Sequence, residues 1–180
     1  LKGLIISKAE GLPLEKVMGK ANGVDTVLNL EHVATKDNNS HITELMVGSE
    51  PAKPKTGPNS AMELQGMLEN FRDMVKKAAA NDPKLQASAD EMFNFEPRKD
   101  ASGTLNNWAS MNFYHVPLAA GITILSKMQT DIRTMENELV GRMMSGVEAK
   151  TFKFNTLTAI IQPLSSYVTV GGKYQANIFL

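Results

Sequence analysis

The sequence contains no cysteine, only three histidines, and equal numbers of acidic and basic side chains, 19 of each. Without cysteine the chain can form neither a disulfide framework nor a thiolate zinc site, and it has no cysteine nucleophile. A formal net charge of zero argues against the basic surface that binds nucleic acid or an anionic membrane. We therefore expect no affinity for nucleic acid.

Long apolar runs and strong compositional bias are missing as well. The longest uncharged apolar stretch with a helix-like pattern is Val116–Ser126, whereas a bilayer span takes roughly 20 residues. We expect no membrane-spanning helix within the chain. A hydrophobic content of 42% and a charged content of 21% are ordinary for a globular protein. The 180 residues suffice for one domain, or for one domain and part of another.

Both ends of the sequence look like the interior of structural elements. Leu1, Leu4 and Ile5 fit the last turns of an amphipathic helix, which Gly11 would end. Residues 177–180 continue a strand-like pattern up to the final residue. We therefore expect the sequence to be a piece of a longer protein.

The segment after the first helix has weak periodicity. Residues 12–45 combine short apolar clusters with glycines and polar runs, which predicts irregular structure with one or two short helices or strands. Residues 48–60 contain three prolines, at positions that neither a helix nor a central strand tolerates. This second stretch is predicted to be a linker or a surface loop.

Two helices follow, and each has a start signal. Ser60 and Glu63 have the spacing of a capping box, in which each side chain bonds the backbone amide of the other residue. Asp82 and Pro83 are typical of an N-cap and a first helical residue, and this second helix should end near residues 93–95. Three- and four-residue spacing predicts one buried apolar face on the first helix: Leu64, Met67, Leu68, Phe71, Met74, Val75 and Ala78.

The strongest element is a long helix with Pro117 as its predicted first residue. If it ends near Ser145, it has about 29 residues and is about 44 Å long at 1.5 Å per residue. It carries one continuous apolar stripe: Leu118, Ile122, Leu125, Met128, Ile132, Met135, Leu139 and Met143. An aromatic cluster at the start of this stripe has few other places to be buried. Four residues are therefore predicted to form the centre of the core: Trp108, Phe113, Ile122 and Leu125.

The character of the sequence changes after the long helix. Residues 151–180 contain two lysines, no acidic residue and many β-branched or aromatic side chains, which favour strands. Gly171-Gly172 is a hairpin or bulge signal, and apolar side chains alternate along residues 174–180. Because two or three strands alone are only marginally stable, they need the helical part, a second copy, or a partner absent from this chain.

The histidines form no recognisable catalytic or metal-binding motif. His32, His41 and Asp37 could in principle meet in a folded loop as metal ligands, but polar side chains in loops are usually solvated, and we expect that here. His115 lies at the entrance of the long helix, where a capping or packing role is expected rather than catalysis. We predict no metal site.

The other candidate motifs, a phosphate loop and two carboxylate pairs, do not indicate a functional site. The Gly171-Gly172-Lys173 run lacks the earlier glycine and the following hydroxyl residue of a phosphate loop, since Tyr167 and Tyr174 occupy those positions. The carboxylate pairs Asp90-Glu91 and Glu136 with Glu138 fall on helices, where such groups mostly belong to the solvated face. We therefore predict no catalytic or cofactor-binding residue, and no enzyme.

The eleven methionines allow two interpretations. An adaptable binding groove is one, and core filling at helical spacing is the one that we favour. Seven of them fall on predicted helices: Met62, Met67, Met74, Met92, Met128, Met135 and Met143. From the residues alone, a structural or interaction module explains the sequence best. The alternative is a small-ligand or protein-binding sensor, built from the irregular first part of the chain against the helices.

Two stretches carry a resemblance to a known family. One is the continuous run Trp108–Gln129, and the other comprises Phe152–Asn155, Pro163–Val168 and Gly172–Ala176 in this order. They resemble the GldM/PorM family of gliding-motility and type IX secretion shaft proteins, at the passage from the helical first periplasmic domain to the first β-sandwich domain. Nearer the N-terminus, only the turn Leu45–Gly48 and the proline-rich loop after it look similar.

The resemblance implies a fold and an organisation. We expect a mainly α chain, with a helical bundle and one long helix over residues 1–148 as the first periplasmic domain. The first strands of an incomplete β-sandwich domain would follow over residues 149–180. Anchoring in the inner membrane would come from an N-terminal helix that this chain lacks.

The resemblance also implies a function. Family members form a homodimeric periplasmic shaft that passes motion from a proton-driven inner-membrane partner, GldL or PorL, to periplasmic ring proteins. The membrane partner would bind a segment absent here, and the ring proteins would bind absent C-terminal domains. In the family the proton-handling acidic residues belong to the membrane part. No catalytic, cofactor or metal residue is therefore carried over to this sequence.

Overall fold

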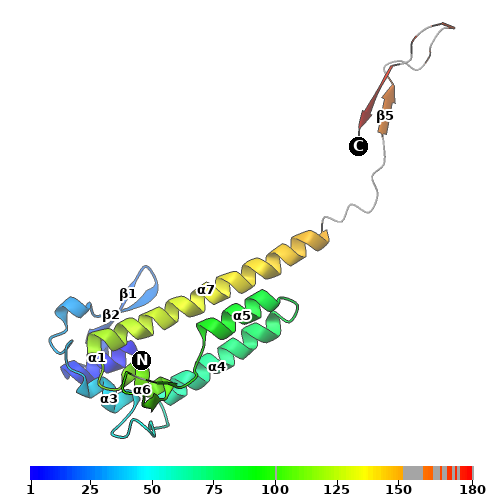
Figure 1. Ribbon diagram of the computed structural model, residues 1–180. Coiled ribbons are helices and arrows are strands. Elements are labelled where there is room, and N and C mark those ends of the chain that lie inside the picture. The colour runs from blue at the N-terminus through cyan, green and yellow to red at the C-terminus, as the bar shows by residue number, and fades with distance from the viewer. Residues whose placement is uncertain are drawn as a thin grey trace. The chain divides into compact units, whose positions relative to one another are not determined.

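The computed structural model describes residues 1–99, 101–151, 160–163, 167, 170–171, 173 and 175–179. The chain divides into two compact units, Leu1–Val140 and Gly141–Leu180. The described residues of unit 1 include six α-helices and the beginning of a seventh, which pack around one apolar core. Figure 1 shows how these helices are arranged. The expectation of a mainly helical fold with one long helix is confirmed. None of the described helices is long and apolar enough to cross a membrane.

The first forty-six residues are more ordered than predicted. Helix α1 ends at Gly11, whose φ of 64° gives the expected left-handed cap. Asn22 and Gly23 both have positive φ, which brings the strands on either side into an antiparallel hairpin. Because these strands are almost fully exposed, no alternating pattern marks them in the sequence. The elements here are α1 (Lys2–Glu10), α2 (Leu14–Val17), β1 (Met18–Ala21), β2 (Val24–Val27), the 3-10 helix η1 (Leu30–His32) and α3 (Ser40–Met46).

Residues 48–60 form the predicted loop, and it is a surface loop fixed to unit 1. The carbonyl of Pro51 accepts a hydrogen bond from Asn107 Nδ2, at 2.7 Å, and another from the Ser110 hydroxyl. The Lys55 amide bonds the Val47 carbonyl at 2.8 Å, which closes the base of the loop. The loop is therefore tied to the residues that begin α6 (Trp108–Phe113).

Helix α4 (Ala61–Ala78) starts at the predicted cap, with one change of partner. The Ser60 side chain accepts the Glu63 amide at 3.2 Å, as a capping box requires. The Glu63 carboxylate, however, accepts the Asn59 amide at 2.6 Å and not that of Ser60. The Ser60 amide is already bonded to the Gly57 carbonyl, so the glutamate reaches one residue further back.

The apolar face of α4 is narrower than predicted. Leu68 and Val75 are buried, whereas Met67 and Met74 are 59% and 64% exposed and Ala78 is also exposed. The backbone of α4 packs against α5 (Pro83–Met92) and α6, and these neighbours leave part of the apolar stripe exposed. The assignment of both methionines to the core was therefore wrong. Helix α5 itself begins and ends as predicted, with Asp82 as N-cap and Pro83 in the first turn.

Helix α7 (Leu118–Thr151) has 34 residues and is longer than predicted. It begins at Leu118, so Pro117 is the residue before the helix and not its first residue; the Pro117 carbonyl accepts the Gly121 amide at 3.0 Å. Of the predicted stripe, four residues are buried and three are partly buried. Met143 is 57% exposed, which corrects its assignment to the core.

The predicted centre of the core is confirmed. Trp108, Phe113, Ile122 and Leu125 are between 0% and 9% exposed. Trp108 lies edge-on between two aromatic rings, with centroid distances of 5.3 Å to Phe95 and 5.9 Å to Phe113. The strands β3 (Arg98–Lys99) and β4 (Leu105–Asn106) form a short antiparallel pair in the loop ahead of α6. The aromatic cluster thus joins the loop after α5 to α6.

The described part of unit 2 contains the end of α7 and one antiparallel pair of strands. Strands β5 (Ile160–Pro163) and β6 (Ala176–Phe179) pair with Ile160 opposite Phe179 and Pro163 opposite Ala176. Gly171, with a φ of 88°, lies in a turn between them. No β-sandwich occurs among the residues that the structure describes. Tyr174, Gly172 and Leu180 of the predicted pattern lie outside those residues, and the domain limits 1–148 and 149–180 stay a prediction.

Candidate functional site

The histidines considered in the sequence do not come together. His32 is exposed on η1, His41 is partly buried in α3, and no group of three potential metal-ligating side chains occurs in the described part of the chain. His115 has a φ of 53° and its amide donates to the Thr43 hydroxyl at 2.9 Å. Its ring stacks on Tyr114 with centroids 4.3 Å apart. Its contacts are therefore those of a turn residue ahead of α7.

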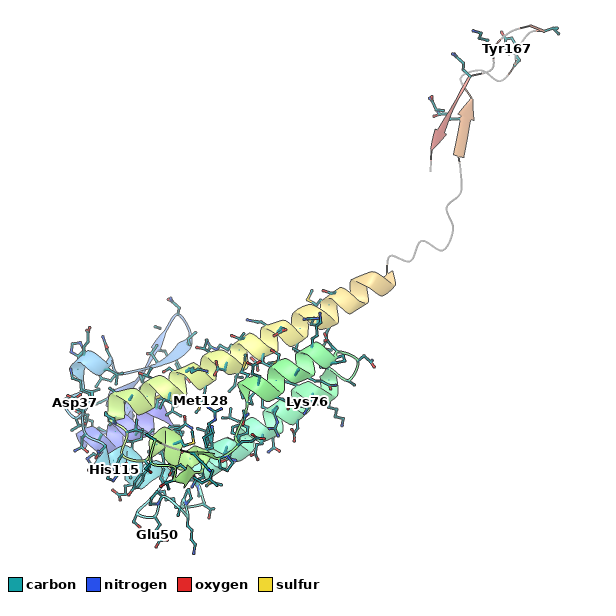
Figure 2. The ribbon with its side chains drawn as sticks, in the orientation of Figure 1. Asp37, Glu50, Lys76, His115, Met128 and Tyr167 are labelled. Carbon is teal, nitrogen blue, oxygen red and sulfur yellow. The ribbon has the colours of Figure 1, made fainter. Side chains whose placement is uncertain are left out.

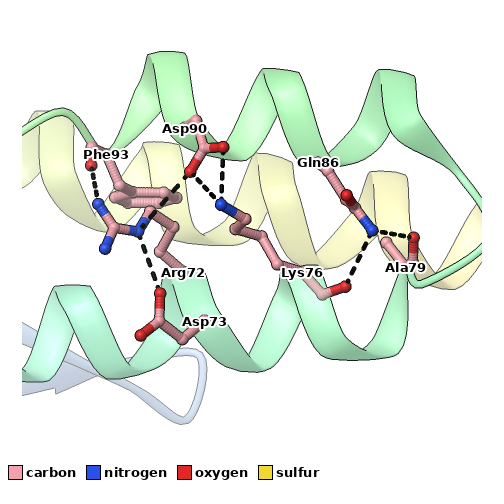
Figure 3. A network of polar contacts seen from close by, with 7 residues as sticks. All are labelled: Arg72, Asp73, Lys76, Ala79, Gln86, Asp90 and Phe93. Carbon is pink, nitrogen blue, oxygen red and sulfur yellow. Dashed lines mark hydrogen bonds and ion pairs between the residues drawn. The ribbon is translucent and has the colours of Figure 1, made fainter.

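Asp90, which we predicted to lie on the solvated face of its helix, connects two helices (Figure 3). Asp90 of α5 accepts Lys76 Nζ of α4 on both carboxylate oxygens, at 2.8 Å each. Arg72 Nε lies 3.9 Å from Asp90 and 3.2 Å from Asp73, and Arg72 Nη1 donates to the Phe93 carbonyl at 3.3 Å. This cluster fixes the α4–α5 hairpin at one end.

The other end of the hairpin has its own polar contact. Gln86 Nε2 donates to the Ala79 carbonyl at 3.0 Å and to the Lys76 carbonyl at 3.4 Å, at the last turn of α4. The Lys76 and Asp90 side chains are 36% and 48% exposed, so their ion pair adds little to stability. The contact joins a residue of α4 to a residue of α5.

Glu10, the last residue of α1, is a second carboxylate that connects two segments, and no motif in the sequence marks it. Glu10 accepts the Thr35 amide at 2.8 Å and the Thr35 hydroxyl on the same oxygen. The Thr35 hydroxyl, followed by its amide, holds the pKa of the Glu10 carboxyl below its ordinary value of 4.5. The two residues are 25 positions apart, so no local pattern could have paired them.

An apolar groove of 550 Å³ lies within unit 1, between α1, the β1–β2 hairpin, α4 and α7. This volume lies in the usual range for small-molecule sites. Lys2 and Asp25 also line the groove, and Lys2 Nζ donates to the Ser126 hydroxyl at 3.2 Å. Met128, labelled in Figure 2, belongs to the α7 wall. Among the apolar lining residues are Leu4, Val27, Leu64, Leu68, Leu125 and Ile132.

These features define a class of protein. The sequence has balanced charge, and its described residues form a helical bundle with polar contacts between helices and no group of three potential metal ligands. Such an arrangement is typical of a structural or interaction module. A family model, described as the GldM N-terminal domain, matches residues 13–146. The chain therefore belongs to the GldM/PorM family and is a GldM component of the gliding-motility and type IX secretion machinery.

The family match covers α2 to α6 and most of α7. The run Trp108–Gln129, on which the first resemblance rests, lies inside it. Residues 147–180 lie outside it, so the resemblance of that part to a β-sandwich domain stays a prediction. No curated protein sequence matches the chain.

Proposed function

We propose that this chain is a mechanical component of the type IX secretion and gliding motor. In this proposal it forms the first periplasmic part of a homodimeric shaft, which passes motion from the proton-driven inner-membrane partner GldL or PorL to periplasmic ring proteins. The observation that carries the proposal is α7, a single continuous helix of 34 residues. A continuous helix resists bending better than a flexible linker does.

Location and partners follow from the family and are part of the proposal. The shaft would lie in the periplasm, anchored in the inner membrane by a helix outside this sequence. The contacts with GldL or PorL and with the ring proteins would also lie outside it. We propose no catalytic turnover and no nucleic-acid binding for the residues of this chain.

Breaking α7 at the boundary between the units tests the mechanical role. Gly141 is exposed, and a Cβ there would meet no atom within 4 Å. Gly141→Pro should interrupt the helix, because proline removes a backbone hydrogen bond and its ring clashes with the carbonyl four residues earlier. Gly141→Ala is the matched control, since alanine favours the helix.

Both variants should be made in the full-length gene of the source bacterium. We expect Gly141→Pro to abolish gliding and type IX secretion at normal protein levels, and Gly141→Ala to retain both. Thermal unfolding of the purified variants by circular dichroism establishes that unit 1 stays folded. Normal secretion by a folded Gly141→Pro protein would contradict the proposal.

A second candidate function is supported by the apolar groove. We propose as the alternative a small-ligand or protein-binding sensor that uses this groove between the first part of the chain and the helices. A ligand at a hundredfold excess over its dissociation constant stabilises the folded state by about 2.7 kcal/mol. Thermal shift with amphipathic metabolites should then raise the melting temperature, and Met18→Glu in the groove wall should remove the effect. Stabilisation that survives this substitution would place the ligand elsewhere.

A further inference from the structure

We infer that Glu10 and the turn Thr35–Asn38 form a polar connection that ties the end of α1 to the start of α7. This inference rests on the proposed mechanical function and names one route by which a displacement of α1 reaches α7. Glu10 is a positioning residue in this route, because it acts on α7 through the turn. Figure 2 labels Asp37 in the turn and His115 just ahead of α7.

The first link is the contact between Glu10 and Thr35. Glu10 is the last residue of α1, and one of its carboxylate oxygens accepts both the amide and the hydroxyl of Thr35. Two donors from one residue fix its position more closely than a single bond does. A charged acceptor also makes hydrogen bonds stronger than a neutral one does. The lowered pKa of Glu10 agrees with a carboxylate that stays ionised in this contact.

The second link is the turn itself. The Asn38 amide donates to the Thr35 carbonyl at 2.9 Å, which closes a four-residue turn. The Asn38 side chain accepts the Ser40 amide at 2.7 Å, so the turn is also fixed to the first residue of α3. A displacement of Thr35 therefore moves the turn as one body.

The third link joins the turn to α7. The first amides of an α-helix have no partner within the helix and need one from elsewhere. At the start of α7 the Leu118 amide donates to the Asn38 carbonyl and the Ala119 amide to the Lys36 carbonyl, at 2.9 Å each. The turn that Glu10 holds is thus the cap of the long helix.

Side chains of α1 and α7 share the apolar core of unit 1 and line the groove together. Backbone packing of α1 is mainly against α2 and α3. The Lys2–Ser126 hydrogen bond is a direct polar contact between α1 and α7, and it lies at the first turn of α1. Glu10 lies at the opposite end of α1, and the turn acts on the terminus of α7. The turn therefore adds a polar connection between these two helix ends to the apolar packing of the core.

Amide hydrogen exchange of the whole chain, measured by NMR, tests this connection. In Glu10→Ala, and in Thr35→Val, which loses only the hydroxyl, the Leu118 and Ala119 amides should exchange roughly 2- to 10-fold faster. The Leu68 amide in α4 should keep its rate. Thr35→Ser retains the hydroxyl and should restore slow exchange. Glu136→Ala is the control, because Glu136 is an exposed glutamate on α7.

Two results would overturn the inference. One is unchanged exchange at Leu118 and Ala119 in Glu10→Ala. The other is acceleration that Leu68 shares equally, because Glu10 would then contribute only to the stability of the whole unit. The measurement needs no motor, so its failure leaves the proposed function standing. Normal secretion by Gly141→Pro cells would contradict the proposed function, but it would not contradict the polar connection.

Discussion

Ile122 is 3% exposed and belongs to the same buried apolar core as Trp108 and Phe113. Removing three carbons from a buried isoleucine loses transfer free energy and leaves a cavity, so Ile122→Ala should cost about 2 to 5 kcal/mol of unfolding free energy. Val140 lies on the same helix and is 52% exposed, so Val140→Ala should change the free energy of unfolding by no more than about 0.5 kcal/mol. Urea denaturation followed by circular dichroism measures both. A cost below about 0.5 kcal/mol for Ile122→Ala would remove that residue from the core.

Glu10 makes part of the stability depend on pH. Because folding lowers the pKa of its carboxyl below 4.5, the contribution is complete above that value and is lost as the pH falls through the folded pKa. The difference in melting temperature between the native chain and Glu10→Gln should therefore be constant near neutral pH and shrink below about pH 4.5. Glu136→Gln should show no such change. A difference that persisted unaltered into strong acid would show that ionisation of Glu10 is not involved.

Two glycines of α7 differ in their surroundings. A Cβ at Gly121 would lie 1.8 Å from Cδ1 of the fully buried Ile42, whereas Gly141 faces open space. In a helix interior, alanine is more stabilising than glycine by about 1 kcal/mol. Overpacking a core costs about 1 to 3 kcal/mol of stability. Gly141→Ala should thus stabilise the helix by about 1 kcal/mol. Gly121→Ala should lower the free energy of unfolding by between zero and about 2 kcal/mol, because the cost of overpacking offsets the gain in helix preference.

Thermal unfolding of the two variants, side by side, checks this order. Equal stabilisation by both substitutions would mean that α3 and α7 do not approach closely at Gly121. Because the same replacement is made twice in one helix, the intrinsic preference of alanine cancels in the comparison.

Local signals in the sequence predicted the elements well. The caps at Gly11, Ser60 and Asp82 depend on residues a few positions apart, so the sequence contains their whole cause. The width of a buried face depends on which neighbours cover it, which is why Met67 and Met74 were assigned wrongly. Short helices or strands were predicted for residues 12–45, but β1 and β2 could not be placed, because an exposed hairpin needs no apolar alternation.

The polar contacts could not be predicted from the sequence for a different reason. Asp90 and Lys76 are 14 residues apart, and Glu10 and Thr35 are 25 apart. Such pairs depend on how helices and loops meet in three dimensions, and no spacing rule for one helix reaches that far. The groove has the same origin, because residues of α1, α2, the β1–β2 hairpin, α4 and α7 form its walls.

The strands of unit 2 lead to a prediction about assembly. A two-stranded sheet such as β5–β6 is marginally stable by itself, and an unpaired edge favours pairing with another chain. We expect these strands to pack on a second copy, by exchange or by edge addition. Deleting residues 151–180 should therefore weaken dimerisation, as measured by light scattering over a concentration series of both chains. A truncated chain that dimerises with unchanged affinity would make α7 the better candidate for the contact.

The chain has one tryptophan, and its position has a practical consequence. Trp108 is 9% exposed and lies edge-on between Phe95 and Phe113, wholly within the Leu1–Val140 unit. Its indole emission should move to longer wavelength when water reaches the ring. The natural sequence thus contains an intrinsic fluorophore that reports on unit 1 separately from unit 2, without any label or substitution.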